Sequence, residues 1–197
     1  MSDVTPKQPM ENSSTGNRSN GKNSMQKTAY LALYTVLALI IYLVECQLPP
    51  LTAVPGIKLG LSNIVTLILL RDASFLDCFK VLLARILLAS LLAGQFMSFL
   101  YSFAGGMLCL IVTYLINKLL YGHYILLTSM LGAVCHNLAQ LIVAYFVAGV
   151  FLVYFPFLMI AGIITGFFTG LTAHLIRPYL IRSKALTPFS PKSDGGN

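Results

Sequence analysis

Six long apolar runs, separated by short polar or Pro/Gly-bearing connections, constrain the fold of this chain more than any other feature. A helix that crosses the hydrocarbon core of a bilayer, about 30 Å thick, needs roughly 20 predominantly apolar residues. The sequence therefore predicts an all-α, polytopic membrane bundle of about six transmembrane helices. The predicted spans, numbered here in chain order, cover residues 28–46, 53–70, 75–93, 97–118, 124–148 and 152–176.

Composition supports lipid as the solvent for most of the chain. Of 197 residues, 57% are hydrophobic and only 10% are charged, whereas a soluble domain of this size needs far more charge to cover its surface. The length suits one compact bundle, predicted over residues 28–180. Residues 1–27 are polar and without an apolar run, so we expect a disordered cytoplasmic tail there and a second tail over 181–197.

The second span is the weakest of the six. Pro49, Pro50, Pro55 and Gly56 precede it and cannot continue a helix. Its cleanly helical part, residues 57–70, would rise only about 21 Å at 1.5 Å per residue. Such a short, interrupted segment at membrane depth must be covered by protein or line a cavity.

Basic residues predict the orientation of the bundle. All but two of the 13 Lys and Arg residues lie in the two tails or around the second-to-third and fourth-to-fifth connections. The positive-inside rule places that side in the cytoplasm, together with both termini. The basic balance of the chain therefore needs no nucleic-acid partner.

The two exceptions, Lys58 and Arg85, point to a buried site. A charge near the bilayer centre costs at least about 2.5 kcal/mol on insertion scales, so Arg85 should face the bundle interior or a wet cavity. Polar residues on the first, second and fifth spans are expected to line an outward-opening pocket with these cations. Interhelical hydrogen bonding and a structural Glu45–Lys58 ion pair are the alternatives. The candidate substrate-binding residues are Glu45, Lys58, Asn63, Arg85, His136, Asn137 and Gln140.

Small residues on the sixth span predict close helix contact. Gly162, Gly166 and Gly170 repeat at four-residue spacing, which lets helix backbones approach closely. The partner is either another helix of the bundle or a further membrane subunit that docks on this face.

The residues predict no enzymatic chemistry, no metal site and no cofactor. The apolar region contains only three carboxylates, Glu45, Asp72 and Asp77, with no paired-carboxylate or HExxH motif. Four scattered cysteines fit apolar packing better than metal binding. The run from Gly16 to Lys22 approaches a P-loop pattern but lacks the following Ser/Thr, so any dependence on ATP requires a separate subunit.

Two longer stretches resemble a known family. Residues 55–66 (PGIKLGLSNIVT) and 131–141 (LGAVCHNLAQL) are similar to the signature stretches of a bacterial membrane family called both heptaprenyl diphosphate synthase component I and Gx transporter. Residues 98–106 and 161–166 extend the resemblance, which covers roughly residues 30–176. That family in turn resembles the S components of energy-coupling factor (ECF) transporters, six-helix bundles with both termini inside.

The resemblance implies two functions. The first is a substrate-binding subunit of an importer in the bacterial cell membrane, for a vitamin-, quinone- or isoprenoid-related small molecule. Its partners would be membrane lipid, an ECF-type coupling protein and ATPase subunits. The second is a non-catalytic membrane partner of heptaprenyl diphosphate synthase, because the aspartate-rich motifs of prenyl synthases are absent here.

Overall fold

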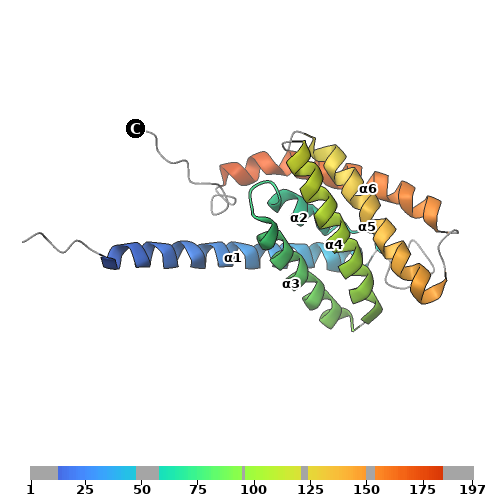
Figure 1. Cartoon of the computed structure of the whole chain (residues 1–197), viewed down its shortest axis with the longest axis horizontal. Helices are drawn as coiled ribbons and strands as arrows, with labels where there is room; N and C mark the ends of the chain where they lie inside the picture. The colour runs from blue at the N-terminus through green and yellow to red at the C-terminus, as the bar shows by residue number, and fades with distance from the viewer. Residues whose placement is uncertain (1–12, 48–57, 95, 121–123, 150–153, 184–197) are drawn as a thin grey trace, which may run out of the picture.

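A computed structural model describes residues 13–47, 58–94, 96–120, 124–149 and 154–183 of the chain. Within these residues the structure is entirely helical, which confirms the predicted all-α bundle (Figure 1). The helices are α1 (Ser13–Glu45), α2 (Asn63–Leu69), α3 (Phe75–Ala93), α4 (Phe96–Leu119), α5 (Ile125–Ala148) and α6 (Phe155–Arg182).

Four helices are long and apolar enough to cross a membrane: α4, α6, Ser24–Glu45 of α1 and Ile125–Val147 of α5. Helix α3 has 19 residues and would rise about 28 Å, but it carries Asp77, Lys80 and Arg85. The six predicted spans thus correspond to four apolar helices, one charged helix and one short helix. These helices are those of a membrane protein.

The second span is not a continuous helix. Helix α2 has seven residues and rises about 10 Å, and residues 58–62 before it are not helical. Gly60 adopts φ 81°, a left-handed conformation that favours glycine and interrupts a helix. The predicted helical span over 53–70 is therefore wrong for residues 58–62, while residues 48–57 lie outside the described part of the chain.

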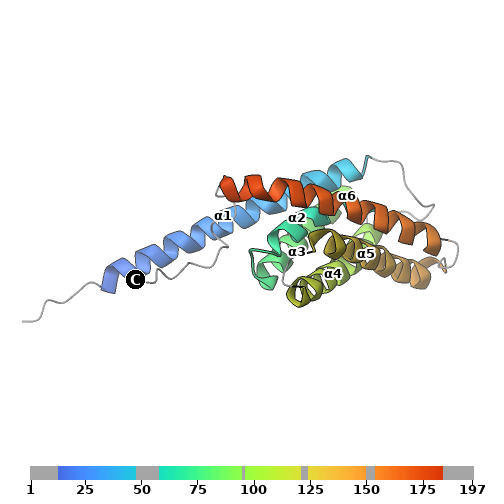
Figure 2. The ribbon, with the colours of Figure 1, turned by 90° about the horizontal axis from the view of Figure 1, so that it is seen from above.

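Helix α1 begins at Ser13, well before the predicted start at residue 28. The expectation of disorder is therefore wrong for residues 13–27. The sequence has no proline between Pro9 and Pro49, and extension of an existing helix needs no new nucleation. Both views show the amino-terminal part of α1 projecting beyond the other helices (Figures 1 and 2).

The glycine row of α6 packs against α5. A Cβ atom built on Gly166 would lie 2.5 Å from Met130 Cα. The same test places a Cβ of Gly162 3.1 Å from Val134 Cα and one of Gly170 2.8 Å from Ser129 Cβ. All three glycines are buried. They are used inside the bundle, so the alternative that they form an open docking face for another subunit is wrong.

Two ion pairs gather charged residues at one end of the bundle. Lys27 Nζ of α1 lies 2.7 Å from Asp77 Oδ2 of α3. Arg177 Nη2 of α6 lies 2.9 Å from Asp72 Oδ1, in the α2–α3 connection. These contacts place the end of α6, the start of α3 and residue 27 of α1 on the same side, as the distribution of basic residues predicts.

We expect Gly166→Ala to reduce the free energy of unfolding by about 1–3 kcal/mol, because its methyl group meets a rigid backbone atom of α5. Thermal unfolding in detergent measures this loss. The exposed Ile164→Ala on the same helix is the control and should change the Tm little. An unchanged Tm for Gly166→Ala would contradict the close α5–α6 contact.

Candidate functional site

The non-helical segment Lys58–Ser62 lies within the bundle and is held by side chains from three helices. The Gly60 N–H donates to Glu45 Oε1 of α1 at 2.5 Å. The Lys58 N–H donates to Gln140 Oε1 of α5 at 3.2 Å. Irregular backbone at membrane depth must find internal partners, because lipid offers none. Glu45 and Gln140 provide these partners, and both are at least 95% buried.

Arg85 approaches the same segment from α3. Its side chain is only 3% exposed, and Nη1 donates a hydrogen bond to Ser62 Oγ. Its guanidinium carbon lies 6.0 Å from the centroid of the Tyr42 ring. The structure thus confirms that Arg85 faces the bundle interior, where Glu45 is the opposite charge that acts on it.

Lys58 bonds to α1 instead of pairing with Glu45. Its Nζ donates to Tyr42 Oη at 2.6 Å and to Cys46 Sγ at 2.9 Å. It also lies 3.9 Å from the Tyr42 ring centroid, in cation–π range. Tyr42 Oη further hydrogen-bonds Ser98 Oγ of α4 at 2.9 Å. Among the described residues no ion pair joins Lys58 and Glu45, so the alternative of a structural Glu45–Lys58 ion pair is wrong.

His136 of α5 occupies a slot between two glycines. A Cβ on Gly60 would lie 2.8 Å from His136 Cδ2, and one on Gly105 would lie 2.7 Å from Cε1. The Asn63 amide hydrogen-bonds His136 Nδ1 at 3.0 Å. Gln140 Nε2 donates to Nε2 of the ring at 2.9 Å, because Gln140 Oε1 already accepts from the backbone of Lys58. The ring therefore links α5 to the first residue of α2.

Asn137 does not belong to this cluster, contrary to the prediction. Its Nδ2 donates to the Leu158 carbonyl oxygen of α6 at 2.8 Å, and it lies against Gly162. Adjacent residues on a helix point in different directions, so Asn137 faces α6 while His136 faces Gly60 and Gly105.

Several site residues were missed by the sequence reasoning. Tyr42 lies one turn before Glu45 on α1 and shares its face, a signal that was available. Gly60, Ser62 and Gly105 lie inside stretches that resemble the family, yet nothing in their residue types shows that they contact Arg85 or His136.

Two polar atoms of opposite charge have no hydrogen-bond partner within the described chain: Arg85 Nη2 and Glu45 Oε2, both buried. Buried polar atoms are normally paired. The cluster also contains two cations, Arg85 and Lys58, against the single carboxylate of Glu45. This arrangement has an excess of positive charge and a free N–H donor, which suits the binding of an acidic or polar group.

We expect Arg85→Met to reduce the free energy of unfolding by about 3–5 kcal/mol, since it leaves the buried Glu45 carboxylate with only the more weakly acting charge of Lys58. Adding Glu45→Gln should recover part of that loss, because Gln retains an acceptor for the Gly60 N–H. Thermal unfolding of the single and double variants forms the test. Strictly additive losses would contradict the coupling of these two charges.

The close contact between Gly105 and His136 can be tested with the adjacent Gly106 as a control. In Gly105→Ala the methyl would lie 2.8 Å from His136 Nδ1, whereas in Gly106→Ala it would meet the flexible end of Leu82 at 2.9 Å. We expect Gly105→Ala to lose about 1–3 kcal/mol of stability and Gly106→Ala to lose less. Equal thermal shifts for the two variants would contradict a rigidly held ring.

Comparison with known proteins identifies the family. The sequence model described as heptaprenyl diphosphate synthase component I matches residues 34–176, more than two thirds of the chain. This match includes Glu45, Arg85, His136 and the segment that they hold. We found no match among curated proteins and none among solved structures. The chain therefore belongs to the heptaprenyl diphosphate synthase component I family.

Proposed function

We propose that this membrane protein is the substrate-binding subunit of a small-molecule importer, similar to the S components of ECF transporters. The observation that carries the proposal is the buried cluster around Lys58–Ser62, which retains Arg85 Nη2 and Glu45 Oε2 without partners among the described residues. Ionisable residues inside a membrane bundle are expensive and mark ligand or ion pathways by default.

The ligand proposed for this site has an acidic or polar head and an apolar body. Arg85 and Lys58 attract the head, and the ring of Tyr42 offers an aromatic wall beside both cations. Vitamin-, quinone- and isoprenoid-related molecules combine these two features. The carbonyl, carboxylate or phosphate oxygens of such molecules accept charge-assisted hydrogen bonds from Arg and Lys.

We further propose that the chain is not itself an enzyme. Asp72 and Asp77 are paired with Arg177 and Lys27, and within the described residues no group of three His, Cys, Asp or Glu side chains is placed to hold a metal ion. Energy for import would come from other chains, namely a membrane coupling protein and ATPase subunits. We place the ion-paired end of the bundle on the cytoplasmic side of the cell membrane because it carries the basic residues.

The family description favours a second candidate function. It names a component of heptaprenyl diphosphate synthase, so the chain would be a non-catalytic membrane partner of a soluble prenyl synthase. Co-purification from native membranes separates the two proposals. Coupling protein and ATPase subunits would accompany an importer subunit, whereas a prenyl synthase would accompany the alternative.

Mass spectrometry of the purified protein tests the binding site directly. We expect wild-type protein to retain a small molecule with an acidic or polar group, and Lys58→Gln to retain at least about tenfold less, because a charge-assisted hydrogen bond contributes about 1.5 kcal/mol or more. Lys80→Gln, an exposed basic position on α3, is the matched control and should retain the wild-type amount. Equal retention by Lys58→Gln, or no retained molecule in wild type, would contradict the proposal.

A further inference from the structure

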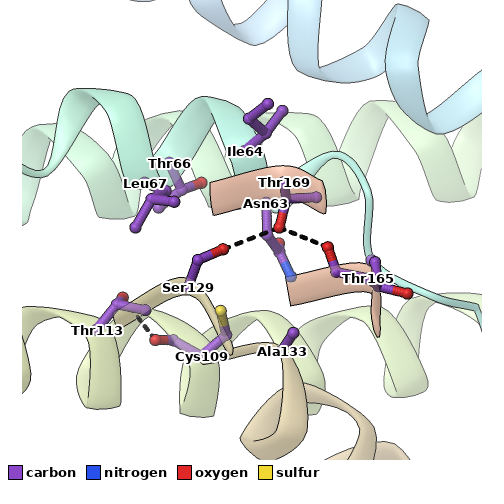
Figure 3. Close-up of a pocket in the computed structure, with 11 residues that line it drawn as sticks. Asn63, Ile64, Thr66, Leu67, Cys109, Thr113, Ser129, Ala133, Thr165 and Thr169 are labelled. Carbon is purple, nitrogen blue, oxygen red and sulfur yellow. Dashed lines mark hydrogen bonds between the residues drawn. The ribbon is translucent and has the colours of Figure 1, made fainter. Parts of the chain in front are cut away.

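A small, partly open cavity lies where four helices meet, separate from the charges of the candidate site. Its volume is about 20 Å³. Hydroxyl groups and one amide dominate the polar part of its wall, and Figure 3 shows these side chains coming from different helices, with the Thr165 hydroxyl pointing away from those of Ser129 and Thr169. The lining residues are Gly60, Asn63, Ile64, Thr66, Leu67, Cys109, Thr113, Ser129, Ala133, Thr165 and Thr169.

Three of these hydroxyls already use their protons. Thr113 Oγ1 donates to the Cys109 carbonyl oxygen at 2.7 Å, and Thr169 Oγ1 donates to the Thr165 carbonyl oxygen at 2.9 Å. Since the proton of Thr169 is engaged, Ser129 Oγ is the donor in the 2.9 Å bond between the two (Figure 3). Thr113 and Ser129 therefore present only oxygen lone pairs to further partners.

Two other hydroxyls have no partner among the described residues. Thr66 and Thr165 are 7% and 6% exposed, and both line the cavity, yet no hydrogen bond involves either Oγ1. Each of these groups has a proton to donate, and a buried hydroxyl is normally hydrogen-bonded. The wall thus suits an occupant that both donates and accepts hydrogen bonds.

The size of the cavity restricts that occupant. A water molecule needs roughly 10–15 Å³ of such space and two to four polar partners, whereas pockets for drug-sized ligands begin near 300 Å³. The lining contains no carboxylate, and the positive charge of Arg85 acts on Cys109 in the wall. Both features disfavour a cation, so a neutral molecule of water's size fits best.

We propose that this cavity binds one structural water molecule. The water accepts a hydrogen bond from the Thr66 hydroxyl of α2 and donates to the lone pairs of Thr113 on α4 and Ser129 on α5. It thereby joins the short helix α2 to α4 and α5. Asn63 lines the cavity and also hydrogen-bonds His136. The water therefore helps to hold Asn63 in place, and through Asn63 it supports the position of His136 in the candidate site.

Two substitutions of Ala133, which lines the cavity, test the proposal. The test is which of the two variants has the higher Tm. Ala133→Cys places a weakly hydrogen-bonding atom where the water lies, and we expect the Tm to fall by about 3 °C or more. Ala133→Ser introduces a hydroxyl that replaces some of the water's bonds, and it should remain closer to wild type. In an empty cavity the larger sulfur would instead raise the Tm above that of the Ser variant.

A gain in Tm for Ala133→Cys, or equal losses for the two variants, would overturn the proposal. An independent experiment measures the Tm of the wild-type protein in equal concentrations of sodium, potassium and choline chloride, and it tests whether the cavity holds a cation. The same Tm in all three salts supports water, and a rise specific to sodium or potassium would show a cation in its place. An experimental structure that resolves ordered water should contain one density peak within hydrogen-bond distance of the Thr66 and Ser129 hydroxyls, and an empty cavity there would refute the assignment.

Discussion

The backbone of residues 58–62 is the constraint on which the rest of the structure depends. This segment is not helical although it lies among membrane helices, so its N–H groups need partners that lipid cannot supply. Glu45 and Gln140 supply them from α1 and α5. Arg85 then holds the Ser62 side chain and is itself opposed in charge by Glu45. Without the irregular segment, Glu45, Gln140 and Arg85 would lose these hydrogen-bond partners inside the bundle.

Close helix packing makes this arrangement possible. The glycine row of α6 lets α5 approach at backbone distance, and Gly105 of α4 lets the His136 ring of α5 lie close against α4. Small residues thereby exclude lipid and bring polar side chains of different helices within hydrogen-bond range. Small residues thus allow tight packing of α6 against α5, and on α4 they make room for the His136 ring of the candidate site.

The sequence predicted what depends on local composition. Apolar runs located α3 to α5 to within one or two residues, and the cost of burying charge correctly placed Arg85 in the interior. The sequence-based predictions were wrong where contacts between distant residues determine the local structure. The helical extension of α1 to Ser13, the left-handed Gly60 and the turning of Asn137 towards α6 all depend on cooperativity or on neighbours distant in the chain. Residue types alone do not encode which face meets which helix.

The length of α1 has a mechanical consequence. Its 33 residues form a rod of about 50 Å, whereas the hydrocarbon core is about 30 Å thick. One end of the rod is fixed in the bundle through Tyr42 and Glu45, and the other projects past the remaining helices (Figure 2). Because Lys27 is still ion-paired to Asp77 of α3, the part of α1 that precedes it is a projecting helical arm of about 21 Å.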